Sequence, residues 1–244
     1  GNIRTIQVNV MGEVKVPGTY AMSSFSNMLH AIYRAGGVNE LGTLREIKLF
    51  RNGKLKASAD LYEFMMDGNA PDEITLEEGD LIIVSPYKNL VDIDGSVKRP
   101  MAYELKEGET VRDLLDYAGG FAGDAYKSNI RVVRQNGAEY QVFTVETPQY
   151  DEFVMMDGDL VTVGTMIDRY ENKLEIKGAV YRPGIYQLGD EIKTVSQLIR
   201  KADGLKGDAF TNRALLHRER EDFTLEVIPI DVKAILEGKA EDLP

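Results

Sequence analysis

The side chains of this chain that could carry out chemistry are few, and their spacing forms no complete catalytic set. The sequence has two histidines and no cysteine. His30 and His217 each stand beside apolar residues, and neither has a serine, a cysteine or a second histidine at the spacing of a catalytic triad or a metal site. We therefore expect both histidines to be structural or solvated. The sequence predicts no catalytic residue and no cofactor.

Carboxylates are abundant, with 40 Asp and Glu residues in 244. They cluster in Asp157-Gly158-Asp159 and in Glu77-Glu78-Gly79-Asp80, and hard cations such as Ca²⁺ prefer oxygen ligands of this kind. The full spacing of a calcium loop, which ends in a bidentate glutamate, is missing. A turn that leads into a buried strand explains the recurring Gly-Asp pair better. We expect no metal site, and no pair of carboxylates is singled out for glycoside hydrolysis.

A glycine-rich segment, Gly119-Gly120-Phe121-Ala122-Gly123, has the composition of a phosphate-binding loop. Such a loop must follow a strand and open a helix. Here the glycines end a helical pattern and lead toward a hairpin, so we interpret them as a helix C-terminus in which glycine adopts the left-handed conformation.

The side chains that best suit ligand contact stand just before three prolines. They are Lys15, Lys98, Arg99, Tyr181 and Arg182. These residues place positive or aromatic groups on exposed loops of an otherwise acidic chain, which suits an acidic sugar or an acidic neighbouring subunit. Solvated turn charges explain the same pattern, and that alternative stays open.

These positions recur because the chain contains an internal repeat. Gly12, Gly95 and Gly178 follow one another at intervals of 83 residues, and a proline and a tyrosine keep the same step in each copy. Coincidences at one fixed period identify a repeat. The repeated tyrosines are Tyr20, Tyr103 and Tyr186. Aromatic faces can hold sugars, but we expect these tyrosines to pack the start of a strand with their hydroxyls hydrogen-bonded.

Each copy predicts the order strand, strand, helix, strand, strand, strand. Residues 6–10 alternate apolar and polar side chains, as a half-buried strand does. Pro17-Gly18 predicts a type II turn into a second strand, and Met101 replaces the glycine in the second copy, where the turn should be type I or strained. Thr110-Val111-Arg112-Asp113 is a capping box that opens a helix. Asn52-Gly53 and its counterpart at residues 136–137 predict β-hairpins.

A short apolar turn (residues 61–65, echoed by residues 231–236) follows the hairpin, and a Gly-Asp strand closes the first two copies, at residues 79–84 and 158–163. This order is the ubiquitin-like β-grasp arrangement. The sequence thus predicts an α+β fold of three tandem β-grasp units, at residues 1–88, 89–168 and 169–244. We expect the third unit to lack its last strand or to borrow one, and the chain to be a fragment of a longer protein.

The repeated residues also resemble a known family. In each copy a glycine, a valine, a proline and a tyrosine stand in the order V-x-G-x-V-x-x-P-G-x-Y, followed by a helix that ends in glycine and, in two copies, by a Gly-Asp strand. The carrying residues are Gly12, Val14, Pro17, Gly18, Tyr20, Gly36, Gly37, Gly79, Asp80, Gly95, Val97, Pro100, Tyr103, Gly119, Gly120, Gly158, Asp159, Gly178, Val180, Pro183, Gly184, Tyr186 and Gly204. This set resembles the SLBB (soluble-ligand-binding β-grasp) family, in tandem repeats like those of outer-membrane capsule and exopolysaccharide export proteins.

The resemblance implies a non-enzymatic segment of a polysaccharide export protein, periplasmic and associated with the outer membrane through regions absent from this chain. The implied partners are a polysaccharide, copies of the same protein in a ring-shaped homo-oligomer, and an inner-membrane export or polymerisation partner. Members of this family also bind cobalamin-like molecules, so a small-ligand or sugar receptor is the alternative. An enzyme that acts on polysaccharide is a third hypothesis, which would need an open cleft with two carboxyl groups.

Bulk composition excludes other classes. The formal net charge is −11, which disfavours nucleic acid and anionic membrane surfaces as partners, because both are bound through clustered Lys and Arg. The sequence has no apolar run long enough to cross a membrane as a helix. No signal peptide is recognised at its start.

Overall fold

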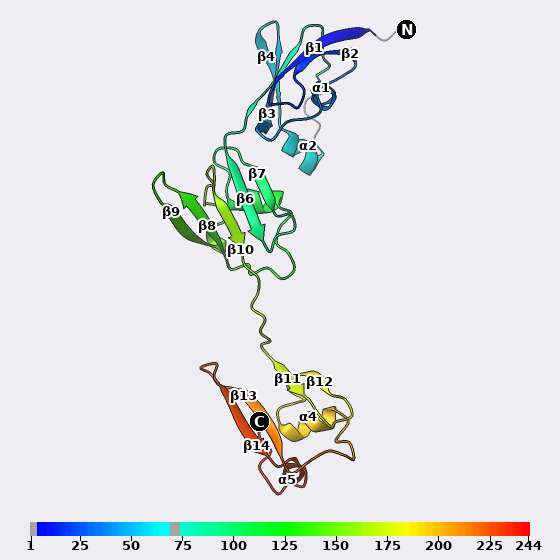
Figure 1. Cartoon of the computed structure of the whole chain (residues 1–244), viewed down its shortest axis with the longest axis vertical. Coiled ribbons are helices and arrows are strands. Elements are labelled where there is room, and N and C mark those ends of the chain that lie inside the picture. The colour runs from blue at the N-terminus through cyan, green and yellow to red at the C-terminus, as the bar shows by residue number, and fades with distance from the viewer. Residues whose placement is uncertain (1–3, 69–73) are drawn as a thin grey trace. The chain divides into compact units, whose positions relative to one another are not determined.

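The computed structural model describes residues 4–68 and 74–244, so the start of the first predicted unit, at residue 1, lies outside the described residues. The protein is α+β, with several small sheets and short helices (Figure 1). The chain divides into two compact units, residues 1–166 and residues 167–244. Among the described residues, no helix is both long and apolar enough to cross a membrane.

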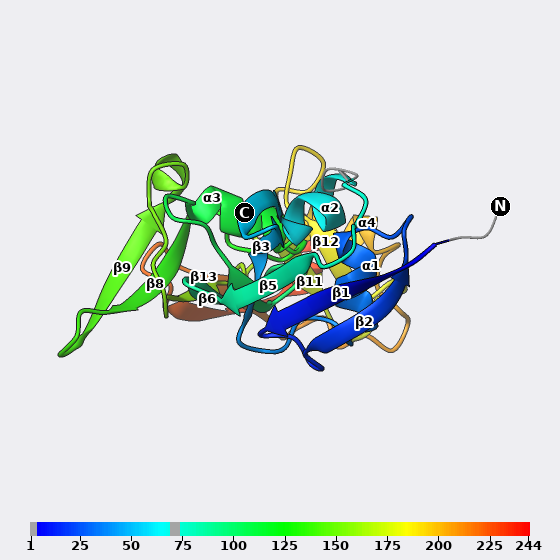
Figure 2. The ribbon, with the colours of Figure 1, turned by 90° about the horizontal axis from the view of Figure 1, so that it is seen from above.

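The first sheet places the strand that is last in sequence at its centre. Its strands are β1 (Thr5–Gly12), β2 (Gly18–Ser23), β3 (Gly42–Arg51), β4 (Lys54–Ala59) and β5 (Leu81–Pro86), in the spatial order β2-β1-β5-β3-β4. β5 runs parallel to β1 and antiparallel to β3, and thus joins two hairpins into one sheet (Figure 2). Two helices, α1 (Met28–Arg34) and α2 (Leu61–Asp67), belong to this part of the chain.

The second sheet repeats the first. Its strands are β6 (Leu90–Gly95), β7 (Met101–Glu104), β8 (Asn129–Gln135), β9 (Tyr140–Glu146) and β10 (Leu160–Val163), in the order β7-β6-β10-β8-β9. The helix α3 (Val111–Tyr117) and the 3₁₀-helix η1 (Thr147–Gln149) accompany it. β10 is again parallel to the first strand and antiparallel to the third. The Gly-Asp strands predicted from the sequence are therefore the central strands of both sheets.

Alternation of apolar side chains explains why these strands form and which face they bury. Ile6, Val8 and Val10 of β1 are buried at 3% exposure or less, while the residues between them face outward. The side chains of Ala31 and Ile32 from α1 pack against this face. Burial of aliphatic side chains of this size contributes about 1.5–3 kcal/mol each. The same pattern, with α3 as the packed helix, builds the second core.

Gly12 and Gly95 end the first strand of each sheet because a side chain has no space there. Both residues have positive φ, +85° and +82°, a conformation that glycine adopts without strain. A Cβ atom on Gly12 would lie 2.1 Å from the carbonyl oxygen of Val84, and one on Gly95 would lie 2.1 Å from that of Val163. The repeated glycine therefore allows the central strand to approach closely.

Residues 167–244 contain β11 (Lys173–Ile176), β12 (Gly184–Gln187), α4 (Val195–Lys201), β13 (Ala214–Glu219), β14 (Leu225–Ile230) and α5 (Val232–Leu236). The order of elements follows the first two copies. The two hairpins, β11-β12 and β13-β14, form separate two-stranded sheets in this fully described part of the chain.

The structure corrects two local predictions and confirms the two hairpins. Gly18 does not have positive φ and already belongs to β2, so Pro17-Gly18 is not a type II turn; the backbone turns at Gly12 instead, and Met101 stands in a strand without strain. The hairpin at Asn52-Gly53 has positive φ at both residues, as a two-residue turn requires, and the hairpin predicted at residues 136–137 forms between β8 and β9 with a tip of four residues, 136–139. The short apolar turns at residues 61–65 and 231–236 are helical, as α2 and α5.

The three repeated tyrosines take the structural role that the sequence indicated. In each copy the hydroxyl donates a hydrogen bond to the carbonyl oxygen of the residue before the proline, as from Tyr103 to Arg99 at 2.9 Å and from Tyr186 to Arg182 at 2.6 Å. Tyr20 does the same with Val16. This bond ties the start of the second strand to the loop that precedes it.

Candidate functional site

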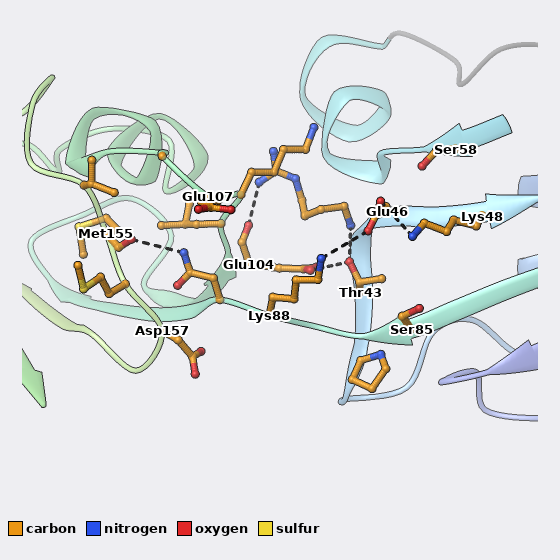
Figure 3. A pocket seen from close by; sticks show the side chains of 18 residues that line it. Thr43, Glu46, Lys48, Ser58, Ser85, Lys88, Glu104, Glu107, Met155 and Asp157 are labelled. Atoms are coloured by element: carbon orange, nitrogen blue, oxygen red, sulfur yellow. Dashed lines mark hydrogen bonds and ion pairs between the residues drawn. The ribbon is translucent and has the colours of Figure 1, made fainter. Parts of the chain in front are cut away.

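A groove of about 860 Å³ lies where the first and second sheets meet, within residues 1–166 (Figure 3). Residues of β3 and the end of β5 line one side, and the loops after β7 and before β10 line the other. Met155 and Asp157 stand at the end of the groove opposite to Glu46 and Lys48. Most of the residues that line the groove are polar or charged.

The wall of the groove contains Arg45, a buried arginine from β3 that binds groups of both repeats. Its Nε lies 3.1 Å from both carboxylate oxygens of Asp60, and its two terminal nitrogens lie 2.9 and 2.8 Å from the carboxylate oxygens of Glu109. Nη2 also lies 3.1 Å from the hydroxyl of Tyr117. The guanidinium carbon is 4.5 Å from the ring centroid of Tyr62 and 5.1 Å from that of Tyr117. The planar, multiply bonded guanidinium thus joins the two repeats, and Arg45 is 7% exposed.

Glu104, at the end of β7, makes a second set of contacts between the repeats. Its carboxylate accepts hydrogen bonds from the hydroxyl of Thr43 at 2.5 Å and from the backbone N–H of Leu44 at 2.6 Å. Its own N–H donates to the hydroxyl oxygen of Tyr62 at 2.9 Å. We call the set of Arg45, Asp60, Glu104 and Glu109 the ionic junction. It fixes the first repeat against the second and so fixes the width of the groove.

Charge and burial act against each other at the junction. Burial alone would raise the pKa values of Asp60 and Glu109, because water no longer solvates their charged forms. Hydrogen bonds outweigh this effect of burial and hold both pKa values below the ordinary range. Asp60 accepts hydrogen bonds from Lys106 and from the Tyr62 N–H, and Glu109 accepts them from Arg45 and Tyr117. Both carboxyl groups are therefore ionised at neutral pH, which the arginine requires as counter-charge.

The rim of the groove carries lysines and an amide without a full set of partners. Lys48 and Lys88 lie 3.2 and 3.9 Å from the carboxylate of Glu46 (Figure 3). The amide oxygen of Asn89 is buried and has no hydrogen-bond partner among the described residues, and its nitrogen lies 3.5 Å from the carbonyl oxygen of Met155. A buried acceptor without a partner costs free energy, so a ligand hydroxyl that reaches Asn89 would be favoured.

The groove contains no histidine among its lining residues, and its Arg45 is paired with Asp60 and Glu109. Within residues 4–68 and 74–244, no cluster of three or more His, Cys, Asp or Glu side chains could hold a metal ion. His30 accepts a hydrogen bond from the backbone N–H of Asn27 and completes the capping box of α1, which is the structural role expected for it. The arrangement suits the binding of a polar molecule.

The carboxylates of the Gly-Asp pairs bind arginines. Asp80 and Asp159 are fully buried. Both oxygens of Asp80 lie 2.9 Å from nitrogens of Arg51, and those of Asp159 lie 2.8 and 2.7 Å from nitrogens of Arg134. A backbone N–H also donates to each of the two carboxylates. The Gly-Asp pair therefore anchors the central strand to the hairpin beside it.

The ligand-contact residues proposed from the sequence lie outside this groove. The backbone N–H groups of Lys15, Lys98 and Tyr181 donate to the carbonyl oxygens of the glycines that follow the helix of each copy. Arg99 donates to the carbonyl oxygen of Tyr117 at 3.0 Å.

Arg182, the fifth of these residues, forms an ion pair with Asp203. The turn before each proline is thus held against the C-terminus of the helix in its own copy. The side chains of Lys15, Lys98 and Tyr181 are exposed.

The sequence interpretation missed the residues of the groove. Their contacts join positions such as 45 and 109, or 43 and 104, and such pairs have no fixed spacing that a motif search could detect. One signal was present: Arg45 and Thr43 stand at positions where the alternation of β3 places side chains in the interior. A charged residue at an inward position indicates a buried ionic contact.

Comparison with known proteins gives two family matches. Residues 6–84 and residues 90–143 each match a family described as "SLBB domain". The first match covers nearly all of the first copy, and the second ends within β9, before β10 and before the groove residues 154–157.

Three curated proteins are similar in sequence over much of this chain. The polysialic acid transport protein KpsD of Escherichia coli is 25% identical over 174 residues, which are 70% of this chain and 30% of that protein. The EPS I polysaccharide export outer membrane protein EpsA of Ralstonia nicotianae is 29% identical over 161 residues, 64% of this chain and 42% of that protein. EpsA of Ralstonia solanacearum is 28% identical over the same shares. The chain thus spans about a third to two fifths of the length of these relatives.

Proposed function

Since this chain belongs to the SLBB family, we propose that it is a segment of a polysaccharide export protein that contacts the polymer and contributes to assembly without catalysing a reaction. The observation that carries the proposal is the groove at the ionic junction. Arg45 and Glu104 hold two repeats in one geometry, and the groove between the repeats is lined by lysines, carboxylates and the partly buried Asn89. Hydroxyl-rich polymers are bound by polar side chains of this kind.

The fold supports a tandem arrangement. We propose three β-grasp units, at residues 1–88, 89–168 and 169–244, with the third lacking its last strand. The identical strand orders of the first two sheets support the first two units. The repeated glycines, tyrosines and element order support the third. Small units of about 80 residues bury little core each, and the ionic junction shows how one leans on the next.

The names of the relatives support a proposal for the location and partners. Their names describe transport and outer-membrane export proteins. We propose that this chain acts in the periplasm, within a ring-shaped homo-oligomer of the full-length protein and together with an inner-membrane export or polymerisation partner. The exposed Lys15, Lys98 and Tyr181, with Arg99 and Arg182 beside them, are proposed as a second contact surface for an acidic sugar or a neighbouring subunit.

The test is binding of defined oligosaccharides to the whole chain, measured by titration calorimetry or by NMR shifts. An acidic oligosaccharide such as an oligomer of sialic acid and a neutral one of equal length serve as probes. Lys88→Ala and Asn89→Ala remove polar groups from the groove, whereas Lys15→Ala and Lys98→Ala change the exposed loops. We expect the groove variants to weaken binding about tenfold, the effect of one or two hydrogen bonds to a charged group.

The comparison of variants separates the two surfaces. If the loop variants weaken binding and the groove variants do not, the contact surface is the one predicted from the sequence. If neither oligosaccharide binds at millimolar concentration, this segment does not contact glycan and its role is assembly alone.

A second candidate function is a receptor for a small soluble ligand. The groove volume of about 860 Å³ favours it, because small-ligand sites commonly measure about 300–1,000 Å³. A corrinoid titration followed by visible absorbance distinguishes the two functions. Saturation with one corrinoid per chain, lost in Asn89→Ala, would support the receptor.

A further inference from the structure

The outer strand of the second sheet, β9, has one edge that no other described strand covers. β9 stands at the end of the strand order and pairs with β8 along its whole length (Figure 1). Just beyond its two ends, the N–H of Thr147 donates to the carbonyl oxygen of Ser128, and the N–H of Asn136 donates to that of Glu139. Hydrogen-bonded pairs alternate along an antiparallel ladder. The odd-numbered residues of β9 therefore bond to β8, and the backbone groups of its even-numbered residues point to the free edge.

The residues whose backbone groups point to this edge are Tyr140, Val142, Thr144 and Glu146. The N–H of Glu146 is already used, since it donates to the side-chain oxygen of Gln149 at 3.0 Å. Among the described residues, no group accepts a hydrogen bond from the N–H groups of the other three. The open part of the edge thus runs from Tyr140 to Thr144 and is centred on Val142. An edge of this kind is a template for a further strand.

The equivalent strands of the other two copies contain residues that oppose such pairing. β4 has Lys54 and Lys56, and lysines on an edge strand disfavour the approach of another strand. β14 contains Pro229, which has no N–H to donate. Residues 140–144 of β9 include neither a charged residue nor a proline. The second copy is therefore the one whose hairpin leaves its outer strand open to pairing.

The opposite edge of the second sheet is covered by the first copy. This edge strand, β7, has only four residues. Its Glu104 donates its N–H to the hydroxyl oxygen of Tyr62, and its carbonyl oxygen accepts a hydrogen bond from Arg45 at 2.9 Å. A strand from outside can therefore reach this sheet at β9 more easily than at β7.

An apolar row on the exposed face of the sheet leads to the centre of the free edge. Leu160 of β10 lies beside Val133 of β8, and Val133 lies beside Val142 of β9. Leu160 and Val142 are 46% and 65% exposed, and Tyr140 on the same face is 67% exposed. The row thus ends at Val142 without a neighbour on the far side.

We propose that two copies of this chain pair through β9, as antiparallel strands related by a twofold axis at Val142. In this register Val142 lies opposite the partner's Val142, and Tyr140 lies opposite the partner's Thr144. Both pairs exchange hydrogen bonds through the backbone groups that point to the edge. The apolar rows of the two copies then join into one, and aromatic residues opposite β-branched ones stabilise a strand pair.

Charge favours a second copy as the occupant of this edge. The chain has a net charge of −11, so most of its surfaces repel those of another copy. Residues 140–144 carry no charge. The nearest acids, Glu139 and Glu146, would lie opposite the partner's Val145 and the partner's Ala138. Like charges directly opposite each other destabilise a strand pair, and this register avoids them.

This contact differs in kind from the contacts of a ring. It is isologous, because the same strand of both copies takes part, whereas rings are built from heterologous contacts. The inference therefore goes beyond the proposed function and does not depend on it.

The first test is the mass of the whole chain in solution, measured by sedimentation equilibrium from about 10 μM to about 1 mM, because a single strand pair belongs to the small, weak class of interfaces. The mass should rise toward that of two chains. Amide hydrogen exchange should slow at least about fivefold at Tyr140, Val142 and Thr144 at the highest concentration, by mass action. The exchange of Gln141 and Phe143, which bond to β8, should not change.

A pair of matched lysine variants locates the contact. Val142→Lys brings two lysines together at the axis and should raise the dissociation constant at least about tenfold. Leu55→Lys is the control, because Leu55 lies beside Phe50 in the first sheet as Val142 lies beside Val133 in the second, and it is 56% exposed. Leu55→Lys should leave the dissociation constant unchanged. A dimer that Leu55→Lys weakens and Val142→Lys does not would refute the proposal.

The absence of cysteine from the sequence allows the register to be tested. Opposite residues of a hydrogen-bonded pair have Cα atoms about 5.5 Å apart, within the range of a disulfide. Under mild oxidation Val142→Cys should therefore link two chains, and so should a mixture of Tyr140→Cys and Thr144→Cys. If Val142→Cys links only to Thr144→Cys, the axis lies at Phe143 and the proposed register is wrong.

A last arm tests the occupant. A chain that stays monomeric up to about 1 mM, with these amides unprotected, refutes the pairing. If it stays monomeric but a separate peptide of residues 138–146 protects Tyr140, Val142 and Thr144, the edge takes a strand from another molecule and the proposed partner is wrong.

Discussion

Replacing Arg45 with methionine should loosen the ionic junction, because the buried Asp60 and the partly buried Glu109 lose the cation that they share. Removing one partner of a buried ion pair costs about 3–5 kcal/mol. Here Asp60 keeps Lys106 at 2.5 Å and the N–H of Tyr62, and Glu109 keeps the hydroxyl of Tyr117 at 2.7 Å. We therefore expect a loss near the lower limit, about 3 kcal/mol in the free energy of junction opening.

Amide hydrogen exchange at Glu104 measures this free energy directly, since the Glu104 N–H donates to the Tyr62 hydroxyl across the junction. A loss of about 3 kcal/mol accelerates its exchange roughly 150-fold. Arg112→Met is the matched control, because Arg112 pairs with Asp151 at the surface, where both side chains are well exposed. Exposed pairs contribute about 0–1 kcal/mol.

A triple variant separates lost attraction from buried charge. Combining Arg45→Met with Asp60→Asn and Glu109→Gln removes the unpaired carboxylates together with the arginine. The exchange of Glu104 should then recover most of its protection, since neither carboxylate that faced Arg45 remains charged. Glu104 keeps its hydrogen bonds from Thr43 and Leu44, and Lys106 keeps Glu63. Arg45→Met with an effect no larger than that of Arg112→Met would show that Arg45 does not hold the repeats together.

Three further predictions concern stability. The depressed pKa values of Asp60 and Glu109 stabilise the folded chain at pH values above about 4, the ordinary range of carboxylates. This stabilisation is lost as the pH falls through the lower pKa values of the folded state. Between pH 7 and pH 2, the melting temperature should therefore fall more steeply in the unchanged chain than in the triple variant. Arg134→Met leaves the fully buried Asp159 without its cation and should destabilise the second sheet by about 3 kcal/mol in urea unfolding, and a loss under 1 kcal/mol would contradict the anchoring role. Gly95→Ala should prevent the second sheet from closing, because the new Cβ would lie 2.1 Å from a backbone oxygen. Gly178→Ala should destabilise the chain only by the strain of an alanine in the left-handed conformation, about 1–2 kcal/mol. Equal melting temperatures of the two variants would contradict the close approach of the central strand at Gly95.

Local structure was predictable from the sequence where one short segment determines it. The alternation of residues 6–10, the capping box at Thr110 and the glycines after each helix predicted strands and helices that the structure confirms within a few residues. The type II turn at Pro17-Gly18 was wrong, because the pattern shows which residues permit such a turn but not where the neighbouring strand forces the backbone to bend.

The candidate groove could not be predicted in the same way. It depends on contacts between residues far apart in sequence, such as Arg45 with Glu109. The inward position of Arg45 in β3 indicates a buried ionic contact but does not identify its partner. The central place of the Gly-Asp strand was also not predicted, since strand order in a sheet depends on which edges remain free after the hairpins form. The proposed turn residues around Lys98 and Tyr181 remain untested.

The central position of the last strand has a consequence for how quickly each sheet can fold. In the first sheet Asn9 pairs with Leu81, so the two hairpins can form early from local contacts but are joined only after nearly the whole repeat has been brought together. Closing a loop of this length lowers the entropy of the chain before the contacts of the strand compensate for the loss. Folding therefore slows as the contacts join residues further apart in sequence. During synthesis, we expect each of the first two repeats to pass through a period in which its hairpins are formed and its inner edges are unpaired. Arrival of the Gly-Asp strand, whose buried aspartate binds the arginine of the third strand, ends that period.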